Sequence, residues 1–402
     1  MSEWKLKDCC LSISDGDHLP PPKSDNGIPF ITISNIDSTN HIDFSNTLFV
    51  PKEYYDNLDS IRKAQSDDII YSVVGSFGKP VLIKENKKFV FQRHIAILRP
   101  NNEIVDSRYL YYIMLSRDFY MQADSVAVGA AQRTISLTSL RNMKVNLPKL
   151  SIQHRIATIL SRYDSLIENY QKQIKLLEES AQRLYKEWFI DLRFPGHENT
   201  KIVDGVPEGW EKKKIYDVCD TIGGGTPSTK VQEYYEGGNI SWVTPTDITR
   251  NNSLCLLATE KKITQEGLDH SSAKMLPAET ILMTSRASVG YFGICDFEVC
   301  TNQGFISCVP FKKNIQMYLL YNLMSRVEEI RTKAGGSTYL EISKSVFRNF
   351  DIISPSDDVL NVFQHKSHQK LDSIRCLSKK IRHLTEARDR LLPKLMNGEI
   401  EV

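Results

Sequence analysis

The sequence predicts an α+β protein with two similar mixed α/β domains separated by two long antiparallel coiled-coil helices. The first observation is a tandem repeat, because residues 129–148 match residues 336–355 at an offset of 207 residues, as between Ser136 and Ser343. The second is that each copy starts with short β-branched and aromatic runs and ends in a long apolar stripe. Such a duplication indicates two copies of one structural unit, related by a pseudo-two-fold axis.

The length of 402 residues fits two or three domains, since a domain usually has about 100 to 200 residues. The repeat and the apolar stripes then place the boundaries. We expect a first globular domain (1–148), a central long helix (149–192), a linker with a second globular domain (193–355) and a C-terminal long helix (356–402).

Each globular part is expected to combine strands with one packed helix. Runs rich in β-branched and aromatic residues, bounded by Gly, Pro and Asn, are typical of strands. One helix per copy should pack on them, at 107–118 and at 315–331. The clearest strand candidates are residues 29–33, 89–98, 281–284 and 304–309.

Long helices are expected after Pro148 and Pro355, because proline commonly precedes or opens a helix. Apolar residues recur every seven positions in the first and alternate by three and four in the second. Such heptads require a partner helix, and two stripes of matching length favour pairing with each other. A helix packed on its own domain is the alternative. The predicted pairing residues are Ile156, Tyr163, Tyr170, Leu177 and Leu184 in the first helix and Ile374, Leu377, Ile381, Leu384 and Leu391 in the second.

The charge balance limits how the chain could bind nucleic acid. Its 51 Lys and Arg residues face 49 Asp and Glu residues, for a net charge of +2, whereas a protein that coats nucleic acid is usually strongly basic. Any DNA contact must therefore be local. No apolar run approaches the about 20 residues of a membrane helix, and the start resembles no targeting segment, so a cytoplasmic location without membrane contact is expected. The eight cysteines lack zinc-site spacing and should be reduced and mostly buried.

Motifs for catalysis and cofactor binding are missing from the sequence. No phosphate-binding G-x-x-x-x-G-K-[ST] loop and no G-x-G-x-x-G after a strand is present, so no site for ATP, a dinucleotide or S-adenosylmethionine is expected. His365 and His368 lack an acidic third ligand and are expected to be solvated or partly packed rather than metal-bound. The carboxylates of Asp67 and Asp68, and of Asp296 and Glu298, lack a following lysine, so an ion site there is disfavoured. No metal is expected.

Loops in both copies carry polar groups suited to DNA. Glycine allows amide groups to approach phosphates, Ser, Thr and Lys add donors, and adjacent amide side chains can pair with adenine. A plain Gly-rich hairpin loop is the alternative for residues 221–230. The candidates are Gly224, Gly225, Thr226, Ser228, Lys230, Thr246, Ser285, Arg286, Ser288, Asn302 and Gln303 in the second copy, and Ser76, Lys79, Arg93 and His94 in the first.

Several segments together resemble one protein family. The strongest are QHRIATIL, DSLI, LYKEWF and LRFPGH within residues 153–197, followed by VPEGW, GGGTPS and ISWVTPTDI within residues 206–248. The segment 391–400, LLPKLMNGEI, adds a similar ending. Over essentially its whole length the chain resembles the specificity subunit of type I restriction-modification systems. It departs from the family pattern in the first copy, where residues 15–18 replace the Gly-Gly-Gly-Thr-Pro run and no Asn-Gln pair precedes Ile95.

The resemblance implies a noncatalytic DNA-recognition subunit. Its two target-recognition domains would each read one half of a bipartite asymmetric site in double-stranded DNA. Two modification subunits would bring S-adenosylmethionine and methylate adenine, and restriction subunits would bring ATP and Mg²⁺ for translocation and cleavage. No cofactor is implied on this chain itself. The alternatives are a self-contained nuclease or methyltransferase, a coiled-coil scaffold that does not read DNA, and the recognition subunit of a related system with a fused cleavage-methylation polypeptide.

Overall fold

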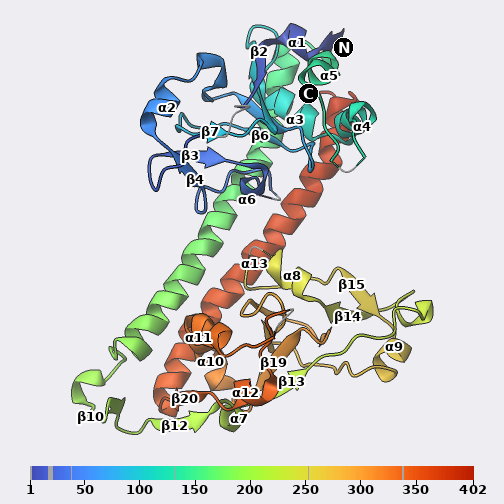
Figure 1. Cartoon of the computed structure of the whole chain (residues 1–402). Helices are drawn as coiled ribbons and strands as arrows, with labels where there is room; N and C mark the ends of the chain where they lie inside the picture. The colour runs from blue at the N-terminus through green and yellow to red at the C-terminus, as the bar shows by residue number, and fades with distance from the viewer. Residues whose placement is uncertain (1, 17–20, 38, 131, 252, 337–338) are drawn as a thin grey trace. The chain divides into compact units, whose positions relative to one another are not determined.

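The chain folds into two compact units in a computed structural model that describes all residues except 1, 17–20, 38, 131, 252 and 337–338. Unit 1 comprises Met1–Ser165 together with Leu384–Val402, and unit 2 comprises Leu166–His383. Unit 1 is therefore built from two separate stretches of sequence. Figure 1 shows both units and labels many of their elements.

Unit 1 contains three small sheets. A two-stranded sheet pairs β1 with β9, a four-stranded sheet has the order β2-β8-β5-β6, and a three-stranded sheet has the order β4-β3-β7. All pairs are antiparallel except β3 with β7, which is parallel. The strands are β1 (Ser2–Lys5), β2 (Cys10–Asp15), β3 (Ile28–Ile31), β4 (Leu48–Val50), β5 (Ile69–Ser72), β6 (Pro80–Leu82), β7 (Val90–Phe91), β8 (Ile95–Pro100) and β9 (Lys144–Leu147).

Unit 2 repeats this arrangement strand by strand. It has a β12-β20 pair, a four-stranded sheet β13-β19-β16-β17 and a three-stranded sheet β15-β14-β18, in which β14 and β18 are parallel. The strands are β12 (Glu211–Lys214), β13 (Cys219–Gly223), β14 (Ile240–Val243), β15 (Lys261–Ile263), β16 (Ile281–Thr284), β17 (Phe292–Ile294), β18 (Cys300–Thr301), β19 (Phe305–Pro310) and β20 (Asp351–Ser354), preceded by the hairpin β10 (Ile202–Val203) and β11 (Val206–Pro207). The matching strand orders confirm the tandem repeat and the α+β fold class.

Short helices connect and cover these sheets. In unit 1 they are α1 (Leu6–Cys9), α2 (Lys52–Asp56), α3 (Ser107–Leu115), α4 (Arg117–Val126) and α5 (Leu137–Asn142). In unit 2 they are α7 (Ile215–Val218), α8 (Pro245–Thr249), α9 (Gln265–Asp269), α10 (Gln316–Ser325), α11 (Val327–Thr332) and α12 (Lys344–Arg348).

Two predicted helices and one predicted strand are divided in the structure. Each single helix, 107–118 and 315–331, is a pair: α3 with α4, and α10 with α11. At the first break, Ser116 leaves the helical conformation and its hydroxyl accepts the Phe119 N–H, which starts a new helix. The predicted strand 89–98 was also wrong, because β7 and β8 belong to different sheets. The polar turn at Gln92, closed by the Ile95 N–H, separates them.

The two long helices, α6 (Leu150–Tyr185) and α13 (Asp357–Met396), begin two residues after Pro148 and Pro355, as predicted. α6 ends in a π-helical turn, Lys186–Ile190. In unit 1 the start of α6 packs with the end of α13, through residues such as Ile156 and Leu395. In unit 2 the end of α6 packs with the start of α13. Within each unit the helices are therefore antiparallel (Figure 1).

The predicted pairing residues are buried to different extents. Both cores also contain strand and short-helix residues, so the helices pack on their own domains as well as on each other. Tyr163 and Leu384 are half-buried without belonging to a core. Ile156, Ile374 and Leu377 are buried, whereas Tyr170, Leu177, Leu184, Ile381 and Leu391 are half-buried against a core.

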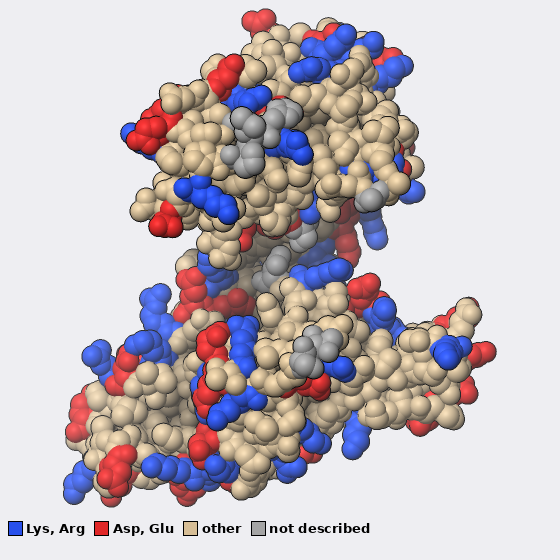
Figure 2. Space-filling view, viewed as in Figure 1, with Lys and Arg blue, Asp and Glu red and all other residues tan. Residues whose placement is uncertain are grey.

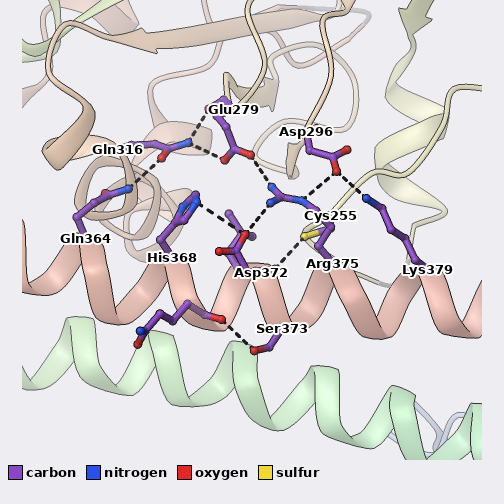
Figure 3. Close-up of polar contacts among 12 residues, drawn as sticks. Cys255, Glu279, Asp296, Gln316, Gln364, His368, Asp372, Ser373, Arg375 and Lys379 are labelled. Carbon is purple, nitrogen blue, oxygen red and sulfur yellow. Dashed lines mark hydrogen bonds and ion pairs between the residues drawn. The ribbon is translucent and has the colours of Figure 1, made fainter.

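A polar network within unit 2 links the middle of α13 to the segments that carry Glu279 and Asp296, as Figure 3 shows. Arg375 on α13 has a side chain that is 13% exposed, and its Nη2 lies 2.6 Å from Oε1 of Glu279. The same guanidinium lies 3.5 Å from Asp296, which also pairs with Lys379 at 2.8 Å. Arg375 also binds Asp372, one turn earlier on α13, at 2.8 Å. One cation therefore neutralises carboxylates from three separate segments.

In unit 1, Arg388 is the one charged residue in the apolar stripe of α13. Its Nη1 lies 2.7 Å from Oδ1 of Asp164 on α6, and the Tyr112 hydroxyl donates to the other carboxylate oxygen. Burial opposes the charge of Arg388, but the hydrogen bond and charge of Asp164 outweigh it and raise its pKa. The ion pair thus joins α6 to α13, and the hydrogen bond from Tyr112 joins α3 to the same carboxylate.

Replacing Arg388 with methionine should destabilise unit 1 by about 2 to 4 kcal/mol, because a largely buried carboxylate loses its partner. Urea denaturation followed by circular dichroism measures the effect. R390M, at an exposed position on the same helix, is the control and should change stability by less than about 0.5 kcal/mol. Equal stability of the two variants would contradict a structural role for the Arg388–Asp164 pair.

Candidate nucleic-acid interface

Four loops of unit 2 contact one another. We call them the second loop cluster: residues 224–230 after β13, 285–291 between β16 and β17, 302–304 between β18 and β19, and the described part of 334–342. The Thr226 hydroxyl donates to the Gln303 side chain. The backbone N–H of Ser285 donates to Gly304 O at 2.8 Å, and that of Ala287 donates to Leu340 O at 2.8 Å. These contacts join loops that lie far apart in the sequence.

Gly224 and Gly225 allow two backbone segments to approach closely. A Cβ atom on Gly224 would lie 2.2 Å from the carbonyl oxygens of Thr301 and Asn302, and one on Gly225 would lie 2.3 Å from the Ser272 hydroxyl. The Gly225 N–H already donates to Thr301 O at 2.9 Å. The close packing of the fold therefore accounts for glycine at both positions. The Gly225 N–H is already used in a hydrogen bond within the protein.

The polar candidates in the second loop cluster differ in exposure. Thr226, Ser228, Lys230, Arg286 and Gln303 are exposed, whereas Asn302, Ser288 and Thr246 on α8 are half-buried. Oδ1 of Asn302 accepts the Gly304 N–H at 2.9 Å and so shapes the turn. Ser285 is buried, and its backbone binds two neighbouring loops. The exposed five are the side chains best placed to touch a ligand, and Ser285 fits a structural role.

Unit 1 has an equivalent arrangement, which we call the first loop cluster: residues 72–79, 92–94 and the described part of 128–134. The Val73 N–H donates to His94 O at 2.9 Å, as Ser285 does to Gly304. The Gly75 N–H donates to Arg133 O at 2.9 Å, as Ala287 does to Leu340. The two units therefore share one backbone frame that carries different side chains.

Among the candidates of the first loop cluster, Ser76 and Arg93 are exposed, and Lys79 and His94 are half-buried. Burial and the nearby charge of Arg93 lower the pKa of His94. The departure at residues 15–18 keeps the close backbone packing, since a Cβ atom on Gly16 would lie 2.2 Å from Phe91 O. Asp17 and His18 lie outside the described residues.

Some side chains in or beside these clusters were not selected from the sequence. Phe77 in the first cluster stacks on Tyr120 of α4 at 5.8 Å, and the Arg133 guanidinium lies over Phe77 at 5.4 Å. In the second, Glu341 lies 3.5 Å from Arg286, and Tyr339 is 59% exposed. The glycines on both sides of Phe77 were the sequence feature that could have pointed to this aromatic pair.

Two of the four carboxylates considered as ion sites, Asp68 and Asp296, have protein partners. Asp68 is buried and binds Arg99 at 2.9 Å, and Asp296 belongs to the Arg375 network. His368 lies 3.8 Å from Asp372. Among the residues that the structure describes, no group of three or more His, Cys, Asp and Glu side chains is arranged to hold a metal ion. All eight cysteines are free thiols, and six of them are buried.

The distribution of charge on the visible face bears on DNA contact. On the face shown in Figure 2, Lys and Arg side chains lie among Asp and Glu side chains in both units. This mixture matches the near-neutral total and agrees with the expectation that DNA contact is local. In the described part of the chain, no helix is long and apolar enough to cross a membrane.

A family model for the type I restriction modification DNA specificity domain matches the chain twice, over residues 2–179 and 207–383. The chain belongs to this family. The two matches fall on the two copies of the repeat, so each copy is a DNA specificity domain. This assignment confirms the resemblance found in the sequence and establishes DNA target recognition as the role of the protein.

Individual relatives agree with the family assignment. The HindI specificity subunit of Haemophilus influenzae is 25% identical and is aligned over 100% of both chains. The MjaIX specificity subunit of Methanocaldococcus jannaschii is 36% identical over 38% of this chain and 36% of its own. A crystal structure of a type I restriction-modification S subunit from M. genitalium has a TM-score of 0.59 at 15% identity, covering 98% of this chain and 95% of that one. The last likeness shows that the fold is shared.

Proposed function

We propose that this chain gives a type I restriction-modification complex its target, and that each loop cluster reads one half of a bipartite asymmetric site in double-stranded DNA. The supporting observation is that one backbone frame carries different polar side chains in the two units. Arg286 and Gln303 stand in the second loop cluster where the first has Val74 and Arg93. Different side chains on equivalent frames suit two different half-site sequences.

The enzymatic steps are assigned to partner subunits. Two modification subunits would bind S-adenosylmethionine and methylate adenine, while restriction subunits would use ATP and Mg²⁺ for translocation and cleavage. The sequence supports this division because it lacks a nucleotide-binding loop. The relatives support it because they are named as specificity subunits of type I restriction enzymes. Methylome sequencing of a host with and without this gene would test the proposal and return the target.

The purified chain alone should neither cleave nor methylate DNA, since its sequence lacks the loop motifs that bind ATP or a dinucleotide. The assay incubates it with DNA, Mg²⁺, ATP and radiolabelled S-adenosylmethionine, and the complex reconstituted with its partner subunits is the positive control. Reproducible turnover by the chain alone, at a level independent of added partners, would contradict the noncatalytic assignment.

A further inference from the structure

Arg286 and Glu341 form an ion pair within the second loop cluster. Nε of Arg286 lies 3.5 Å from Oε2 of Glu341, with side chains 44% and 49% exposed. Exposed ion pairs contribute little to stability, so stability alone does not account for a carboxylate on this surface. A carboxylate next to DNA also repels phosphates, which makes its presence in a DNA-reading loop informative.

The backbone fixes both members of the pair before any ligand binds. Arg286 and Glu341 face each other in an isolated antiparallel bridge. The Ala287 N–H donates to Leu340 O at 2.8 Å, and the Ile342 N–H donates to Ser285 O at 3.0 Å. Ala287 has a φ of +59°, a left-handed conformation that is uncommon for a residue other than glycine. Such strained residues occur preferentially at functional sites.

Side-chain support for this hairpin comes from within the fold. Thr284 is fully buried, and its hydroxyl donates to Ser288 O. The Thr284 hydroxyl oxygen also accepts the Tyr291 N–H at 3.0 Å. Arg331 on α11 donates from Nε to Val289 O at 3.1 Å. The loop that carries Arg286 is therefore rigid, as a residue that reads a base edge requires.

The equivalent position in unit 1 carries no charge. Val74 and Thr134 form the matching bridge of the first loop cluster. The shared fold therefore needs neither the arginine nor the glutamate at this place. The pair is one of the side-chain differences between two units with the same backbone frame, which is where specificity for different half-sites should lie.

We propose that Glu341 is a positioning residue that holds the Arg286 guanidinium so that it reads a guanine in the half-site of unit 2. Glu341 approaches the Nε side, while Nη1 and Nη2 carry four of the five guanidinium N–H donors. Bidentate pairing of arginine with guanine O6 and N7 is the commonest specific contact in the major groove. An arginine that only bound phosphate would gain nothing from a carboxylate that offsets its charge. This inference rests on the proposed DNA-reading function.

The test uses the full complex and the variants R286A, R286K, E341Q and E341D. Its readouts are the methylated motif in cells and binding to duplexes that change one base pair of the target at a time. R286A should relax one G·C position, with discrimination there falling about 5- to 150-fold. R286K should relax the same position, because lysine cannot pair bidentately. E341Q should weaken discrimination at that position and strengthen non-cognate binding at low salt, whereas E341D should retain the motif.

The matched control is E211Q, which removes an exposed carboxylate that pairs with Lys213 at 2.6 Å on β12, outside the loop cluster. It should leave the motif unchanged. Uniform loss of affinity across all duplexes in R286A would identify a phosphate contact and overturn the inference. So would an E341Q effect at a position that R286A leaves intact, or loss of folding in the conservative variants R286K and E341D. Failure of the wild-type complex to show any motif would instead refute the proposed function.

Discussion

Exchanging residues 1–148 for the corresponding domain of a relative will change one half of the DNA target and leave the other half unchanged. The structural reason is that the two ends of this segment pair with each other. Ser2 on β1 pairs with Leu147 on β9, so its two ends lie side by side in one small sheet. The segment 211–354 closes in the same way, through Glu211 and Ser354. Methylome sequencing of a strain with the hybrid subunit measures the result.

The junction with α6 decides whether such a hybrid folds. The Gln153 side chain, fully buried on α6, accepts the Asp106 N–H at 3.0 Å and donates to Ile104 O at 3.2 Å. The donor domain should therefore offer the same backbone groups to this glutamine. The reciprocal exchange of 211–354 is the matched control and should change the opposite half-site. A folded hybrid that altered both halves would contradict independent reading by the two domains.

Replacing Arg375 with methionine should destabilise unit 2 by about 3 to 5 kcal/mol, because the largely buried Glu279 carboxylate loses its cation, whereas Asp296 keeps Lys379. Glu279 and Asp296 are 25% and 29% exposed, so water screens them only in part. Differential scanning calorimetry or urea denaturation measures the loss. R382M, at an exposed position on the same helix, should change stability by less than about 0.5 kcal/mol. Similar losses in both variants would indicate a general sensitivity of α13.

The same network should make unit 2 sensitive to acid. Burial raises the pKa of Asp296, but Lys379 and Arg375 outweigh it, so the pKa lies below the ordinary 3.8. A carboxylate whose pKa is lower in the folded than in the unfolded state stabilises the fold at pH values above its unfolded-state pKa. This stabilisation is lost as the pH falls through its folded-state pKa. The D296N variant should therefore lose less stability than wild type between pH 5 and pH 3. If the free energies of unfolding of wild type and D296N fell in parallel with pH, Asp296 would not contribute to the acid sensitivity.

The sequence predicted the larger features of the fold because they repeat. The offset between Ser136 and Ser343 required two equivalent domains, and Pro148 and Pro355 marked where the long helices begin. The break between β7 and β8 was missed because Gln92 is a single polar residue after an apolar run, and a strand pattern tolerates it. Ser116 was missed because serine ends a helix only in some contexts.

Side-chain roles in the loop clusters depended on contacts that the sequence does not display. Gly224 looked suited to phosphate, yet the backbone of Thr301, far along the chain, is what requires a glycine there. Glu341 was not selected because it is far from Arg286 in the sequence, and only the fold brings the two together in a bridge. Exposed candidates such as Lys230 and Arg93 remain predictions that base-by-base binding measurements can test.

Unit 1 is assembled from Met1–Ser165 and Leu384–Val402, which emerge from the ribosome at different times. At about 5 to 20 residues per second, residues 166–383 delay the second stretch by roughly 10 to 45 seconds. During that interval Ile156 and Leu160 lack the covering provided by Leu395, and nascent unit 1 keeps an apolar surface open to chaperones. Unit 2 is continuous and can complete its core first. Unit 1, although it begins at the amino terminus, is thus the later unit to complete its core. A nonsense codon just before residue 384 would release a chain in which unit 2 is folded, whereas unit 1 is incomplete and open to proteolysis.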